Sequence, residues 1–380
     1  MPIPAEREPI TPAVFLEMSA DISYRLSGTA FDPRALLDII FLGLDKSPCD
    51  EALLVRAISV LQKGYGDRRR KLGPLAVVHP IRATTLLARI TRDPTLLDLV
   101  LTLLHDKDED LIRTTLGDDR WDTMVREMAL LEGMLDDPHR WYLGERMYLL
   151  TRSPEVPYNA YLVRLLSHSQ QMPDLLRVKL ADRLDNTLDV GTNLHGIPGQ
   201  GVFGVIFDTL FLPDYMGLQA PSRYVPLIEA EGVQILANLF KNAMFMSLLR
   251  SERCSLAGST SRLCCSLLTA SIRIAQFVVH DAFATLDVRE QKSAVREVMT
   301  YCSGGGLGAI RKGGLHPLDG LFLDRYGDTE GRKSRLRDVF LDRPLFARVG
   351  LVFLALFSNF INNPDYMIGG INEGGMWAVE

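Results

Sequence analysis

Apolar residues recur along most of this chain at spacings of three and four, which place them on one face of an α-helix. The stretches ALLDIIFLGL (35–44), DEALLVRAISVLQ (50–62) and LLDLVLTLL (96–104) show this spacing. Alternating apolar and polar runs, which are typical of half-buried strands, are scarce along the sequence. The pattern therefore predicts an all-α protein.

Expected helix starts are marked by a capping residue that is followed by proline. Such pairs occur at Thr11-Pro12, Asp32-Pro33, Ser47-Pro48 and Asp93-Pro94. The capping side chain accepts a backbone hydrogen bond, and proline is tolerated at the first helical position. In the second half, the apolar spacing predicts helices near residues 208–215, 226–250, 261–286, 288–301, 330–341 and 344–361.

Two glycine-rich stretches, residues 190–206 and 303–320, interrupt this pattern. The first is the best candidate for a domain boundary or a long loop, because glycine and proline punctuate regular structure. The second has neither the GK[ST] signature nor a preceding strand, so we expect a connecting loop rather than a phosphate-binding one.

Composition narrows the class of protein. The chain has 380 residues, of which 47% are hydrophobic, and its net charge of −5 does not suit a general nucleic-acid binder. Its five cysteines form no CxxC pair, which favours a reduced, cytoplasmic protein.

The first residues lack the features of a signal peptide. The apolar run at 349–361 is too short to cross a bilayer, so we expect a buried helix and no membrane partner.

Three segments concentrate residues that bind metals or phosphates: RRRKLGPLAVVHP (68–80), LLHDKDED (103–110) and LLRVKLADRLDNTLDV (175–190). The third segment is helical by its apolar spacing. Asp182 and Asn186 are four residues apart in it, so they should project from one flank of the helix.

Two histidines and two aspartates from these segments suit one divalent cation: His79, His105, Asp106 and Asp182. Imidazole favours transition metals such as manganese, iron or zinc, and carboxylates add hard oxygen ligands. The alternative is that these histidines are ordinary core residues. The joint order H…HD…D on predicted helices favours the metal site.

The acidic end of LLHDKDED needs its own explanation, because the pattern places it at the C-terminal end of a helix. Each carboxylate there should cost about 0.3–1 kcal/mol, which a bound cation would offset. Glu109 and Asp110 should lie one turn beyond the ligands and serve as an acid–base pair. The alternative is a solvated acidic helix end.

Together the three segments resemble the HD-domain metal-dependent phosphohydrolases, and within them the RelA/SpoT-type alarmone hydrolases and small alarmone hydrolases. RKLGPLAVVHP, LLHDKDED and KLADRLDN are similar to the three sequence blocks of that family. The likeness implies an HD-domain helical bundle with an additional C-terminal helical region. The expected regions are N-terminal helices (1–46), the HD phosphohydrolase domain (47–195) and a helical region of unknown role (196–380).

The resemblance also implies roles for individual residues. The metal ligands would be His79, His105, Asp106 and Asp182, and the catalytic pair Glu109 and Asp110. The expected cofactor is one divalent ion, manganese first, with iron or zinc as alternatives. The implied reaction is hydrolysis of the 3′-pyrophosphate of ppGpp or pppGpp, which gives GDP or GTP and pyrophosphate.

Substrate contacts are expected from basic, aromatic and amide side chains: Arg69, Arg70, Lys71, Tyr158 and Asn186. Guanidinium groups bind phosphate bidentately, which suits RRRK (68–71), although a solvated basic turn is the alternative. Tyr158 would stack on a base or wall the pocket, with simple packing as the alternative. The chain departs from the family at Leu75 and Ala76, where proline and tyrosine are usual, and at Asp185, where histidine or an aromatic residue is usual.

Three functions of different classes follow. The first is a manganese-dependent alarmone hydrolase. The second keeps the metal but acts on another nucleotide or phosphodiester, and the third is a non-catalytic nucleotide sensor, which would not need the acidic pair. The expected partner is a nucleotide. For residues 196–380 three alternatives stay open: packing on the HD domain, forming the interface of a homo-oligomer, or covering the site. A second His–Asp pair at 280–281 lacks companion ligands and is not expected to bind metal.

Overall fold

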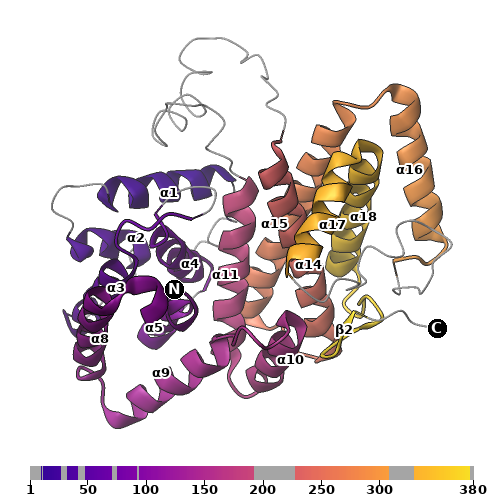
Figure 1. Cartoon of the computed structure of the whole chain (residues 1–380). Coiled ribbons are helices and arrows are strands. Elements are labelled where there is room, and N and C mark those ends of the chain that lie inside the picture. The colour runs from indigo at the N-terminus through magenta and orange to yellow at the C-terminus, as the bar shows by residue number, and fades with distance from the viewer. Residues whose placement is uncertain are drawn as a thin grey trace, which may run out of the picture. The chain divides into compact units, whose positions relative to one another are not determined.

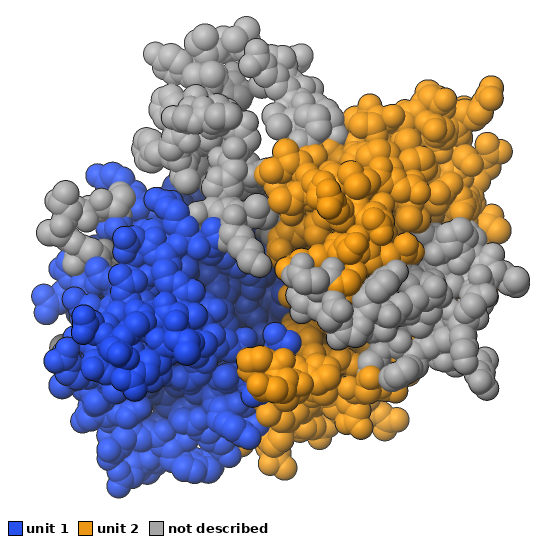
Figure 2. Space-filling model, in the orientation of Figure 1, with its two compact units in different colours: residues 1–153, 173–224, 257–263 blue, residues 154–172, 225–256, 264–380 orange. Residues whose placement is uncertain are grey.

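A computed structural model shows an all-α protein, as the apolar spacing predicts (Figure 1). The described residues are 10, 12–26, 32–41, 48–70, 75–91, 94–191, 227–307 and 329–376. Within them, the chain divides into two compact units, shown in Figure 2. Unit 1 comprises residues 1–153, 173–224 and 257–263, and unit 2 comprises residues 154–172, 225–256 and 264–380. The division into three regions stays a prediction.

Unit 1 is built from helices and one 3₁₀ turn: α1 (Pro12–Leu26), η1 (Pro33–Leu36), α2 (Leu37–Phe41), α3 (Pro48–Tyr65), α4 (Val78–Ile90), α5 (Leu96–Leu104), α6 (Lys107–Asp110), α7 (Arg113–Leu116), α8 (Asp118–Glu132), α9 (Asp137–Leu150) and α11 (Pro173–Gly191). Helix α4 is central, because it packs against α1, α2, α5 and α11. All of its residues except Arg89 are buried, which is typical of a helix surrounded by others. α3 packs on α5 and on α8.

The sequence predicted that a helix starts at Asp93-Pro94, but α5 starts two residues later than this proline. The helix begins at Leu96, and Thr95 is its N-cap. The Thr95 hydroxyl accepts a hydrogen bond from Asp98 N, and the Asp98 carboxylate accepts one from Thr95 N. This capping box satisfies two backbone donors at once, so it sets the start of the helix in preference to the proline.

Unit 2 contains α10 (Tyr158–Ser169), α14 (Glu229–Ser251), most of α15 (Gly258–Phe283), α16 (Val288–Ser303), α17 (Thr329–Leu341) and α18 (Arg343–Asn362), with a short hairpin of β1 (Ile371–Asn372) and β2 (Gly375–Met376). α18 packs on α14, α16 and α17, and its apolar side buries a row of phenylalanines. Gly232 allows α14 and α17 to approach closely, because a Cβ atom there would lie 2.1 Å from the Phe340 ring. The hairpin is tied to α10 by Asn159, which donates to Asn372 O at 2.8 Å.

Two described helices, α15 and α18, are long and apolar enough to cross a membrane by length and composition alone. α18 has 20 residues, so it is longer than the apolar run at 349–361. Half of the apolar window of each helix is buried, and core helices of soluble proteins pass the same test. The cytoplasmic location stays a prediction.

Asp281, from the His–Asp pair at 280–281, has a structural role. Asp281 is fully buried, accepts a hydrogen bond from Leu227 N and pairs with Arg343 at the start of α18. The cysteines in the described residues, Cys254, Cys264, Cys265 and Cys302, are free. Most of the two glycine-rich stretches and the expected helix at 208–215 lie outside the described residues.

Candidate metal centre

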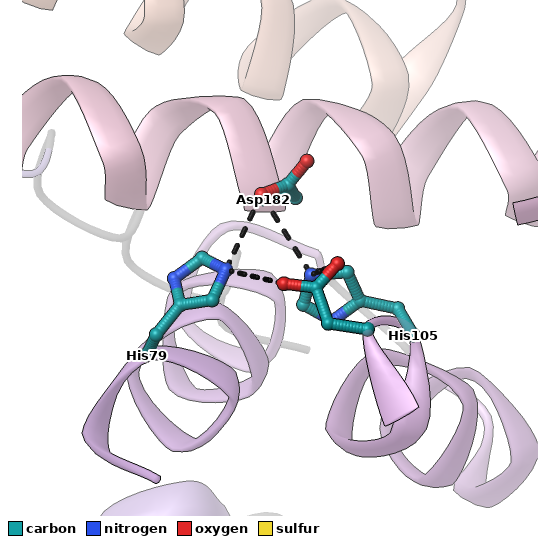
Figure 3. A group of neighbouring side chains, drawn as sticks. His79, His105 and Asp182 are labelled. Carbon is teal, nitrogen blue, oxygen red and sulfur yellow. Dashed lines mark ion pairs between the residues drawn. The ribbon is translucent and has the colours of Figure 1, made fainter. Parts of the chain in front are cut away.

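The structure brings His79, His105, Asp106 and Asp182 together in unit 1. Their ligand atoms all lie within 4.8 Å of one another. His79 Nε2 is 3.2 Å from Asp106 Oδ2 and 3.3 Å from Asp182 Oδ1. His105 Nε2 is 3.2 Å from Asp106 Oδ1 and 3.7 Å from Asp182 Oδ1. Figure 3 shows His79, His105 and Asp182 pointing toward one another.

The four residues come from α4, from α11 and from the junction between α5 and α6. His79 is the second residue of α4, and Asp182 lies in the middle of α11, which packs along α4. His105 is the C-cap of α5, and Asp106 is the N-cap of α6. The chain leaves helical geometry at Asp106, and this break turns two adjacent side chains toward the same point.

Burial and ring orientation suit metal binding. His79, His105 and Asp182 are each no more than 5% exposed. His105 Nδ1 donates to the carbonyl of Thr102 at 2.7 Å, so in the neutral ring Nε2 carries the free lone pair. That Nε2 is buried and makes no hydrogen bond. A buried nitrogen with no hydrogen-bond partner, next to two carboxylates, is what a ligand set for a cation requires.

Electrostatics inside the cluster favour positive charge. Burial lowers the pKa of His105, but the charges of Asp106 and Asp182 raise it to about 10. Burial and the charge of Arg70 lower the pKa of His79, but hydrogen bonds to three carboxyl groups raise it well above its ordinary value. Burial raises the pKa of Asp106 and Asp182, yet the cationic groups around them lower both well below the usual range. These shifts favour a positive charge between the carboxylates, which a bound cation would supply.

Asp182 is held from two sides by residues of its own helix. Lys179 Nζ lies 2.8 Å from Asp182 Oδ2. Asn186 donates to Asp182 Oδ1 at 2.6 Å, which confirms that these two residues share one flank of the helix. Lys179 is not among the expected site residues, although its position three residues before Asp182 was a signal that could have identified it.

Asp185 and Arg82 form a second layer behind His79. Asp185 Oδ2 lies 2.6 Å from His79 Nδ1, and Arg82 donates to both Asp185 oxygens. Neither residue is among the expected site residues. Each lies three positions beyond a ligand, but the pairing joins residues 103 positions apart, so local spacing alone could not reveal it.

The sequence predicted that Glu109 and Asp110 continue the helix that precedes His105. The structure shows that this prediction is wrong. α5 ends at Leu104, and the two acids belong to the separate turn α6, where both are exposed. Glu109 accepts a hydrogen bond from Arg152 N at 2.6 Å, and Asp110 accepts one from Tyr65 at 2.8 Å. The predicted repulsion from a helix C-terminus is therefore absent, because these carboxylates follow the N-terminal end of a turn.

The protein environment shifts the acidity of this pair. Desolvation by the surrounding chain raises the pKa of Glu109 and of Asp110, and the negative charge of Asp106 adds to both shifts. A carboxyl group with a raised pKa is better suited to exchange protons near neutral pH. The hydrogen bond from Tyr65 and the charge of His79 partly oppose this rise in the pKa of Asp110.

The basic run RRRK divides between several environments. Arg70 NH2 donates to Asn186 Oδ1 at 2.6 Å, and its NH1 lies 3.7 Å from Asp185. Arg68 donates to the carbonyl of Asp110 at 3.0 Å, whereas Arg69 is exposed and its backbone bridges to Leu75. Lys71 lies outside the described residues. Arg70 is therefore engaged by α11, and its contact with substrate stays a prediction.

Tyr158 belongs to unit 2, unlike the other expected site residues in the described part of the chain. It begins α10, and its ring lies 6.0 Å from that of Tyr161 and 5.4 Å from Lys241 Nζ. Tyr158 is half-buried, whereas Tyr161 is fully buried. The role of Tyr158 in substrate binding stays a prediction.

Comparison of the chain with protein-family models, curated proteins and solved structures gave no match. The candidate centre therefore rests on the chain's own geometry: two imidazoles and two carboxylates that converge from α4, α11 and the break between α5 and α6.

Proposed function

We propose that this protein is a metal-dependent phosphohydrolase that acts on a nucleotide. The observation that carries the proposal is the convergence of His79, His105, Asp106 and Asp182 on one point, with their ligand atoms within 4.8 Å. These residues come from segments up to 103 positions apart in sequence. The acidic pair Glu109 and Asp110 lies in α6, three and four residues after Asp106.

The donor set fits one divalent transition metal. Two imidazole nitrogens and two carboxylate oxygens suit manganese, iron or zinc, and we expect manganese first. A bound ion would polarise a phosphoryl oxygen and lower the pKa of a coordinated water. Ligand distances of about 2.0–2.2 Å are compatible with donor atoms that lie about 3–4.5 Å from one another.

Glu109 and Asp110 would move protons during hydrolysis. Both carboxylates are exposed, and both are fixed by one hydrogen bond, from Arg152 N and from Tyr65 respectively. Desolvation raises the pKa of both carboxyl groups above its ordinary value. A fixed carboxylate can orient an attacking water and take its proton, and such acid–base catalysis contributes about 10²–10⁴-fold.

The substrate class follows from the resemblance to alarmone hydrolases and from charge. A nucleotide pyrophosphate carries several negative charges, which Arg69 and Lys71 would contact. Arg70, which donates to Asn186 and lies beside Asp185, would be a further cationic contact for the substrate. We propose the 3′-pyrophosphate of ppGpp or pppGpp as the first substrate to test.

The direct experiment combines metal analysis with a hydrolysis screen. The purified full chain is analysed for bound metal, stripped with a chelator, reloaded with Mn²⁺, Fe²⁺ or Zn²⁺, and incubated with nucleotides that include ppGpp. We expect one metal ion per chain and metal-dependent release of phosphate or pyrophosphate. His105→Ala should lose both properties.

The control is His139→Ala, because His139 is an exposed histidine of the same unit that pairs only with Asp136 among the ion pairs described. Wild-type protein that binds no metal under any loading condition would contradict the proposal. Metal binding with hydrolysis of a different nucleotide would keep the phosphohydrolase and replace the substrate. Nucleotide binding without hydrolysis would favour a sensor.

A further inference from the structure

Asp185 is a buried carboxylate that lies directly behind His79. It is 0% exposed, and both of its oxygens are hydrogen-bonded. Oδ2 lies 2.6 Å from His79 Nδ1. A carboxylate is only an acceptor when ionised, so Nδ1 must carry the proton of this hydrogen bond.

Arg82 fixes Asp185 in the plane that this hydrogen bond requires. Its Nε donates to Oδ1 at 2.8 Å and its NH2 to Oδ2 at 3.0 Å, which is a bidentate pair. The same NH2 lies 2.7 Å from Asp189, one turn further along α11. The Arg82 guanidinium is itself buried at 3% exposure and lies 5.0 Å from the Phe15 ring centroid. Arg82 therefore has little room to release Asp185.

We infer that Asp185, held by Arg82, is a positioning residue that fixes His79 with Nε2 directed at the ligand cluster. A neutral imidazole has one N–H group, so donation from Nδ1 leaves the lone pair on Nε2. That nitrogen is the one within 3.3 Å of Asp106 and Asp182. A charged acceptor behind a metal-binding histidine also increases its basicity as a ligand.

The two histidines differ in this respect. His105 Nδ1 donates to a backbone carbonyl, that of Thr102, at 2.7 Å. A carbonyl is neutral and belongs to the main chain, so side-chain substitution cannot remove it. His79 instead depends on the charge of Asp185. The inference rests on the proposed metal site, but it does not follow from the family resemblance, which expects histidine or an aromatic residue at position 185.

The test compares Asp185→Asn with a matched control, Asp174→Asn. Asp174 is another buried aspartate of α11 that pairs with a buried arginine, Arg146, but its described partners do not include the two histidines. Zn²⁺ and Mn²⁺ affinities of the full chain are measured by calorimetry. We expect Asp185→Asn to weaken metal binding about 10–100-fold, whereas the control should stay close to wild type.

A spectroscopic readout separates positioning from a general structural effect. In the Zn²⁺-loaded wild type, the Nδ1 proton of His79 should resonate further downfield than that of His105, because its acceptor is charged. Asp185→Asn should move the His79 signal upfield and leave the His105 signal in place. Arg82→Lys, which keeps the charge but loses the fork, should shift both the affinity and the His79 signal in the same direction by less.

Each outcome decides a different point. If the wild type binds no metal, both the proposed function and this inference fail. If the wild type binds metal but Asp185→Asn binds it equally well with an unmoved His79 signal, only the inference fails. An equal loss of affinity in Asp174→Asn would assign the effect to fold stability and would also overturn the inference. If Asp185→Asn does not fold, an unchanged affinity in Arg82→Lys overturns it.

Discussion

Lys179→Met removes the ammonium group that lies 2.8 Å from Asp182 Oδ2. Both residues are buried, at 8% and 4% exposure. Methionine keeps the length of the side chain and its apolar stem, so the change removes charge with little change in volume. The variant should leave Asp182 with Asn186 as its partner on α11 and with the two histidines of the cluster.

The cost of this substitution can be worked from these contacts. Breaking a buried ion pair by removing one partner costs about 3–5 kcal/mol. Asp182 keeps the hydrogen bond from Asn186, and a hydrogen bond to a charged group is worth about 1.5–3 kcal/mol. We therefore expect the lower end, a loss of about 3 kcal/mol in the free energy of unfolding without metal. Mn²⁺ should recover part of this loss, because a cation beside Asp182 replaces the missing ammonium.

Urea unfolding in a chelator, repeated in excess Mn²⁺, measures both effects. Trp121 and Trp141 belong to unit 1, and Trp377 is the remaining tryptophan, so a Trp377→Phe background makes fluorescence report on unit 1. Lys179→Arg keeps the charge and serves as the matched control. A loss below about 1 kcal/mol for Lys179→Met in chelator would show that the ion pair is worth no more than a surface pair, and would refute the reasoning.

Four further substitutions probe the acidic pair and the helix packing. Glu109→Gln and Asp110→Asn should each lower hydrolysis about 10²–10⁴-fold with metal content unchanged, measured by product release and elemental analysis. Their unfolding free energies should change by no more than about 0.5 kcal/mol, because amide oxygens still accept the present hydrogen bonds. Gly232→Ala should destabilise unit 2 by about 1–3 kcal/mol in a thermal melt, because the new methyl group would meet Phe340 2.1 Å away. Gly144→Ala, which meets nothing within 4 Å, should instead be stabilising by up to about 1 kcal/mol, and destabilisation there would contradict the packing argument.

The helical fold and the convergence of His79, His105, Asp106 and Asp182 were predictable, because their signals are local or follow a motif. Apolar spacing located α3, α5 and α11, and the H…HD…D order named the residues that converge. The break between α5 and α6 was not predictable from local signals, because no glycine or proline stands between Leu104 and Lys107. The run of apolar residues followed by acids is compatible with one continuous helix.

The contacts that Arg70 and Asp185 make could not be predicted from the sequence for a different reason. Arg70 turns toward Asn186, which is 116 positions away, and no spacing rule connects residues that far apart. A run of four cations is compatible both with phosphate binding and with a solvated turn, so the sequence alone does not show which one applies. Asp185 looked like a departure from the family, and only the position of Arg82 beside it shows what the carboxylate contacts.

The buried pair of Arg82 and Asp185 also constrains how this chain can evolve. Loss of either residue alone would strand a charge in the interior, which costs several kcal/mol, whereas loss of both together removes the problem. In an alignment of homologous chains, positions 82 and 185 should therefore change together, with an apolar residue at the first wherever the second is uncharged. A sequence library randomised at these two positions should recover the same coupling under selection for a folded protein. Homologues that keep both residues would then be those in which a carboxylate orients His79.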